Sequence, residues 1–80
     1  MSDTLDPRSH LGRAVFQMLD VSVRLKPDIR GVVIRVHNAI AAKPKDPGLR
    51  FTLRRDVDFL SREPRLAGIM RQLWKALPQS

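Results

Sequence analysis

Residues 27–42, PDIRGVVIRVHNAIAA, decide which fold this chain of 80 residues adopts. With the period of an α-helix, the segment places its apolar residues on one stripe. Pro27 and Asp28 are typical of a helix start, and Lys43-Pro44 is typical of a stop. The stripe comprises Ile29, Val32, Val33, Val36, Ala39 and Ile40. This interpretation predicts a mostly helical bundle in which residues 27–42 are helical.

The same segment contains a second pattern, VVIRVH, that is typical of a β-strand. Its β-branched residues favour a strand, and strict alternation turns Val32, Ile34 and Val36 toward a core. Val33, Arg35 and His37 then face outward. The flanking stretches must therefore distinguish the helix from the strand.

Two neighbouring stretches alternate in the same way, VSVRLK at 21–26 and LRFTLR at 49–54. A lone strand at 49–54 lacks hydrogen-bonding partners, and two candidate partners precede it in the chain. Global consistency thus favours the strand at 32–37. We expect an α+β fold, a single domain ordered as helix, three-stranded antiparallel sheet, helix; the helical bundle is the alternative.

Helices are expected at the two ends of the chain, where they would cover one face of the sheet. Residues 9–19 carry apolar residues at helical spacing after Ser9, a suitable N-cap. The same spacing recurs up to Leu77, with Ser61 as the predicted cap and Pro64 in the first turn. A short helical turn is expected at 56–60. Residues 1–7 are predicted to be a flexible N-terminal segment before a basic globular domain at 8–80.

Positive charge is concentrated in the middle of the chain. The formal net charge is +7, and residues 29–55 contain seven bases and one acid, a net of +6. Such a concentration attracts polyanions by displacing counterions from phosphates. Most of the bases are arginine, whose planar fork binds phosphate at two points. The charge pattern predicts a nucleic-acid-binding module that contacts the phosphate backbone through residues 24–55.

The predicted sheet would gather these cations on its solvent-facing side. From the strands come Arg24, Lys26, Arg35, His37, Arg50 and Arg54; Lys43 and Lys45 extend the surface from a loop, and Arg55 from a strand end. Single-strand binders stack bases on exposed aromatic rings, yet Phe51 and Phe59 are assigned to the core and Trp74 to its edge. We therefore expect duplex binding rather than single-strand binding.

Catalytic and metal-binding patterns are weak. His10 and His37 are isolated, so no helical metal pair is predicted, and helix capping explains Asp56 and Asp58 more simply than cation binding. The chain has no cysteine, and its glycines are scattered rather than clustered in a phosphate loop. We expect no enzyme activity, no cofactor and no metal.

An alternative function follows from the small size of the chain. Eighty residues bury a thin core, and free strand edges invite pairing with another chain. The protein would then be an interaction module, an inhibitor or assembly factor, that binds an acidic protein surface or forms a homodimer. No apolar run is long enough to span a membrane and no secretion signal is visible, so no membrane partner and a cytoplasmic location are expected.

Overall fold

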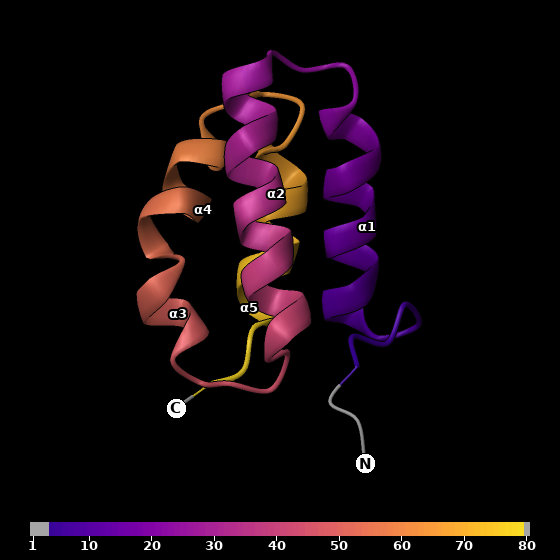
Figure 1. The fold of residues 1–80 in the computed structure, drawn as a ribbon, viewed down its shortest axis with the longest axis vertical. Helices are drawn as coiled ribbons and strands as arrows, with labels where there is room; N and C mark the ends of the chain where they lie inside the picture. The colour runs from indigo at the N-terminus through magenta and orange to yellow at the C-terminus, as the bar shows by residue number, and fades with distance from the viewer. Residues whose placement is uncertain (1–3, 80) are drawn as a thin grey trace.

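Helices follow one another along residues 4–79, the part of the chain that the computed structural model describes. They are α1 (His10–Ser22), α2 (Pro27–Ala42), α3 (Leu49–Thr52), α4 (Arg54–Ser61) and α5 (Ala67–Ala76). Only Leu53 separates α3 from α4, so these two form one arm of a four-armed bundle whose consecutive arms run in opposite directions (Figure 1). Helices α1 and α4 each pack against both α2 and α5, which closes the bundle.

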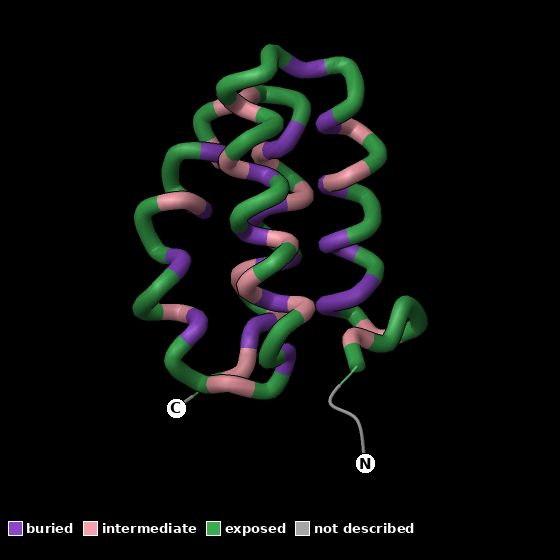
Figure 2. Tube along the Cα trace, in the orientation of Figure 1, coloured by how far each residue is buried: buried purple, intermediate pink, exposed green. Residues whose placement is uncertain are grey.

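The core follows from one repeated spacing. Helix α2 and the segment ending at Leu77 each contain four core residues, in which the second, third and fourth follow the first by four, seven and eleven positions. The first residue of the α2 set is only partly buried. These sets are Ile29, Val33, Val36, Ile40 and Leu66, Met70, Leu73, Leu77. Alternate steps of four and three keep the apolar side chains on one stripe and suit bundles with nearly antiparallel helices. Figure 2 shows the buried residues on the inner sides of the helices.

Helix α1 has the same spacing with one polar substitute. Leu11, Val15, Met18 and Ser22 are buried, and the Ser22 hydroxyl donates a hydrogen bond of 2.7 Å to the carbonyl of Leu19. That bond satisfies a polar group that burial would otherwise destabilise. A serine therefore occupies the final core position of α1 without an unpaired hydroxyl.

The predicted three-stranded sheet is wrong, and the helical alternative is correct: residues 4–79 contain helices and no strand. The stretch predicted as a strand at 21–26 ends α1, forms a turn and supplies the residue before α2. The stretch at 32–37 lies inside α2, and that at 49–54 covers α3, Leu53 and the start of α4. Helix α2 spans the residues that the alternative interpretation gave, from Pro27 to Ala42.

Burial shows why the two-residue period misled. The strand pattern turned Ile34 and Phe51 inward, yet Ile34 is 53% exposed and Phe51 is 89% exposed. Val33, assigned to the outward face of the strand, is fully buried. In a helix, residues three and four apart lie on the same face. When the apolar stripe of a helix is wide, five or six consecutive residues can therefore also alternate between apolar and polar, as in a strand.

The helix termini confirm one predicted cap and contradict another. The Ser9 side chain accepts a hydrogen bond of 2.9 Å from the amide of Gly12 and caps α1, as predicted. Ser61, predicted to begin the last helix, instead ends α4, and Pro64 lies in the connecting turn before α5 begins at Ala67. The predicted helical turn at 56–60 is confirmed within α4.

The segment before α1 lies close to that helix. Leu5 packs against the core, and the carbonyl of Asp6 accepts hydrogen bonds from the backbone and side chain of Ser9. Residues 1–3 of the predicted flexible segment lie outside the described part, and the flexibility of 1–7 stays a prediction. Within residues 4–79, no helix combines the length and hydropathy needed to cross a bilayer.

Candidate functional site

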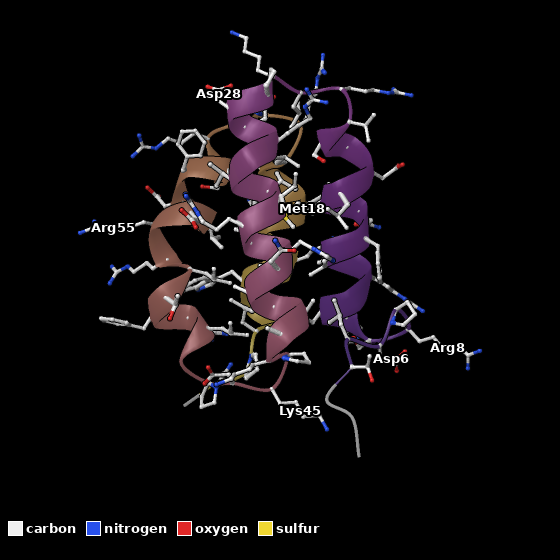
Figure 3. The ribbon with its side chains drawn as sticks, viewed as in Figure 1. Asp6, Arg8, Met18, Asp28, Lys45 and Arg55 are labelled. Carbon is white, nitrogen blue, oxygen red and sulfur yellow. The ribbon has the colours of Figure 1, made fainter. Side chains whose placement is uncertain are left out.

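The predicted contact residues were expected to meet on one face of a sheet. Because residues 4–79 contain no strand, this shared face does not exist. Arg24 and Lys26 lie at the turn between α1 and α2, whereas Lys43 and Lys45 follow the far end of α2. The 16 residues of α2 span roughly 24 Å, at about 1.5 Å per residue. Figure 3 shows Lys45 extending from the lower end of the bundle and Arg55 pointing away from α4. The cations therefore cover several surfaces.

Arg35 is engaged within the protein. Its guanidinium donates two hydrogen bonds, of 2.9 and 2.8 Å, to the carboxylate of Asp56, which joins α2 to α4. These hydrogen bonds, together with the charge of Asp56, raise the pKa of Arg35 above its ordinary value. Arg35 is thus less available to an external phosphate than an arginine without a carboxylate partner.

Arg50 is also held by its own chain. Its guanidinium lies over the indole of Trp74, 5.2 Å from the ring centroid, and donates hydrogen bonds of 3.3 Å to the carbonyls of Leu77 and Pro78. Helix α5 ends at Ala76, so both carbonyls belong to the segment that follows the helix. Arg50 therefore links α3 to the start of that segment and to the indole of Trp74. In His37, Nδ1 lies 3.1 Å from Oδ1 of the neighbouring Asn38.

A groove with a volume of about 840 Å³ lies between α4 and α5. Each helix contributes residues spaced by three, four and seven positions, which form one continuous face of a helix. The α4 side comprises Arg54, Val57, Asp58 and Ser61, with Arg55 beside them, and the α5 side comprises Ala67, Met70, Arg71 and Trp74. We call this hollow the α4–α5 groove.

Positive charge dominates the α4–α5 groove. Arg54, Arg55 and Arg71 are exposed, and none of the three forms an ion pair with a carboxylate within residues 4–79. The acid in the groove, Asp58, pairs at 3.3 Å with Arg62, one turn further along α4. The groove lining thus contains three arginines and one carboxylate, and that carboxylate pairs with Arg62. Of the three arginines, only Arg54 and Arg55 belong to the predicted contact residues.

The rest of the groove is apolar or aromatic. Val57 and Met70 are buried between the two helices, and half-buried Trp74 contributes its indole. The sequence correctly placed Trp74 at the edge of the core. A ligand in this groove therefore meets arginines on both sides and the indole of Trp74 on α5.

A second hollow, of about 510 Å³, lies on the other side of α5, against α1. It is also basic: its lining includes Arg13, Lys75 and His10 together with Gln17 and Gln72. Helix α5 therefore forms a ridge between two basic hollows. Within the part of the chain that the structure describes, no group of three potential metal ligands is present.

Arg71 and Trp74 were not among the predicted contact residues. Residues 56–80 contain four bases and three acids, so the charge distribution along the chain did not single out Arg71. The detectable signal was the spacing of Arg71 and Trp74 by three residues on a predicted helix. Partnering them with Arg54 required knowing that 54–61 is a helix packed beside α5.

Comparison with known proteins found no match: no protein-family model, no curated protein and no solved structure matches this chain.

Proposed function

We propose that the protein is a non-enzymatic nucleic-acid-binding module that contacts the phosphate backbone through the α4–α5 groove. The observation that carries this proposal is the presence of three exposed arginines, Arg54, Arg55 and Arg71, on both sides of one hollow without a carboxylate partner among the described residues. Arginine forks bind phosphate oxygens at two points. A net charge of +7 adds long-range attraction for a polyanion.

The proposal predicts a strong dependence on salt. Each phosphate neutralised adds about 0.7 to 0.9 to the slope of log affinity against log salt. Three groove arginines therefore give a slope of roughly −2 to −3. Binding should be sequence-independent, since phosphate contacts carry no base information.

A matched pair of charge reversals tests the groove. Arg71→Glu changes a groove residue, whereas Arg30→Glu changes an arginine that is also exposed but lies on α2, which packs against α1 and α4. Both variants lower the net charge by two, so long-range attraction falls equally. Affinity for a labelled oligonucleotide, measured by fluorescence anisotropy, should fall at least about tenfold more for Arg71→Glu than for Arg30→Glu, as lost charge-assisted contacts imply. Equal losses would show that net charge, not the groove, governs binding.

We propose that the protein binds nucleic acid in the cytoplasm. The proposed contact surface is the α4–α5 groove and not a sheet face formed by residues 24–55. Arg24, Lys26, Lys43 and Lys45 would contribute only long-range attraction, because they lie at the two ends of the bundle.

A second candidate function is binding of an acidic protein partner or formation of a homodimer. One observation favours it: Phe51, on α3, is 89% exposed and is followed closely by Arg54 and Arg55. Aromatic and arginine side chains are enriched where protein interfaces derive most of their binding energy. Sedimentation equilibrium of the wild type and Phe51→Ser tests self-association; a monomeric wild type would exclude the homodimer.

A further inference from the structure

We infer that the α4–α5 groove takes an unpaired nucleotide, whose base packs against Trp74 while Arg54, Arg55 and Arg71 hold its phosphates. This inference rests on the proposed function and specifies its ligand as single-stranded nucleic acid. The groove has a volume of about 840 Å³ and is open to solvent, so a nucleotide within a longer strand can enter it.

Trp74 is held in position within the groove. The Arg50 guanidinium lies over one face of its indole, 5.2 Å from the centroid, and two carbonyls near the chain's C-terminal end accept hydrogen bonds from that guanidinium. An aromatic side chain that is already fixed loses little conformational freedom when a ligand packs against it. The half-buried indole is therefore preorganised to contact a base.

The positions of the arginines separate the sites for base and phosphate. Arg71 precedes Trp74 by one helical turn on the same face of α5, and Arg54 and Arg55 lie opposite on α4. A base near Trp74 would thus have cations on both sides of the adjoining backbone. This arrangement combines a charged track with an aromatic platform, the combination that single-strand binders use.

A duplex cannot contact both the arginines and the Trp74 indole of the groove. Its bases are stacked and paired in the interior of the double helix, so reaching the indole requires a nucleotide to be flipped out at a cost of a few kcal/mol. The sequence-based preference for duplex depended on a shortage of accessible aromatic rings. The position of Trp74 in an arginine-lined groove removes that reason.

Trp74 also provides the measurement. It is the only tryptophan in a chain without tyrosine, so intrinsic fluorescence above 295 nm excitation reports on this groove alone. The probes are a twelve-nucleotide oligothymidylate, an abasic oligonucleotide with the same number of phosphates, and a twelve-base-pair duplex. We expect oligothymidylate to quench the tryptophan emission, and the abasic strand to bind more weakly without quenching it.

Two variants distinguish a contribution of the Trp74 ring to binding from an effect on folding. Trp74→Leu should weaken oligothymidylate binding by about fivefold or more, the lower range of base–aromatic stacking, and leave affinity for the abasic strand unchanged. Trp74→Phe keeps an aromatic ring and should retain most of the affinity. Anisotropy of labelled strands gives these affinities without using the lost fluorophore, and far-ultraviolet circular dichroism confirms that each variant is folded.

The outcomes distinguish this inference from the proposed function. Equal affinity for oligothymidylate and the abasic strand, or no effect of Trp74→Leu, overturns the base contact while leaving phosphate binding intact. Tighter binding of the duplex than of oligothymidylate overturns the single-strand assignment in the same way. Absence of binding to all three probes at low salt overturns the proposed function, and the inference with it.

Discussion

At the scale of single residues, the ion pair between Arg35 and Asp56 shows how a cation is removed from the binding surface by its own chain. The pair links α2 to α4 through two hydrogen bonds of 2.8 and 2.9 Å, and the Arg35 side chain remains 65% exposed. Water and salt screen such a pair, so its contribution to stability is small. The main consequence of this ion pair is that the Arg35 guanidinium already has a carboxylate partner and is less available to an external phosphate.

A charge exchange tests this pair. Arg35→Asp alone and Asp56→Arg alone each place like charges together and should lower the melting temperature. The double variant restores opposite charges and should recover most of the loss, since the positions couple directly. Thermal unfolding at low salt measures the three variants. Additive losses in the double variant would contradict a coupled pair.

Gly12 and Gly31 should respond oppositely to alanine. A Cβ at Gly12 would overlap the carbonyl oxygen of Asp6, whose backbone lies against α1, whereas a Cβ at Gly31 meets no atom within 4 Å apart from its neighbours and its own helix. Gly31→Ala should raise the free energy of unfolding by about 0.5–1 kcal/mol, the difference in helix propensity. Gly12→Ala should lower it by about 1–3 kcal/mol through overpacking.

Urea unfolding of the two glycine variants gives both free energies. Gly31→Ala, at a position without such an overlap, serves as the control for Gly12→Ala. Equal stabilisation by the two substitutions would show that residues 4–9 do not press on α1 in solution.

At the scale of elements, the arm formed by α3 and α4 separates the two sequence periods. Phe51 and Leu53 face the same side of the predicted strand, but the helical arm exposes Phe51 and leaves only 2% of Leu53 exposed. A strand keeps residues two apart together, while a helix separates them by about 200°. The arm is therefore the place where the period can be tested by mutation.

Phe51→Ser should change the free energy of unfolding by less than about 0.5 kcal/mol, because an exposed side chain has little packing to lose. Leu53→Ala should reduce it by roughly 2–5 kcal/mol, because it leaves a cavity between the arms. Chemical denaturation of both variants checks the difference. A large loss for Phe51→Ser would show that the ring is buried in solution, contrary to its exposure on α3.

The end helices and α2 show how much of the elements the sequence predicted. Apolar spacing located α1, and Pro27 with Lys43-Pro44 marked the limits that α2 has in the structure. What the sequence did not resolve was the choice between helix and strand where β-branched residues are dense, as in residues 32–36. Propensity favours a strand there, and packing of Val33 and Val36 in the bundle overrides it.

At the scale of the whole molecule, excess positive charge is confined to a small volume. The chain has 15 lysines and arginines against eight acids, its Cα radius of gyration is 11.5 Å, and residues 4–79 contain two ion pairs. At about 0.01 M salt the Debye length is about 30 Å, so charges interact across the entire bundle. Repulsion should then outweigh the small contribution of the exposed pairs.

Raising potassium chloride from about 0.01 M to about 0.3 M should therefore increase the melting temperature by a few degrees, since screening relieves repulsion over distances longer than a few ångströms. Differential scanning calorimetry without nucleic acid measures this shift. A control with Arg71→Glu, which lowers the net charge by two, should show a smaller increase. A decrease in melting temperature with salt would mean that attractive pairs dominate.

The sequence by itself determined the net charge, the helices at the two ends and the two candidate structures for residues 27–42, because composition and local periodicity are properties of neighbouring residues. Only the tertiary structure decided that α2 is a helix, that Arg35 and Arg50 are held internally, and that Arg54 and Arg71 share a groove. These outcomes depend on which helix faces lie side by side, and packing between segments far apart in the chain sets that arrangement.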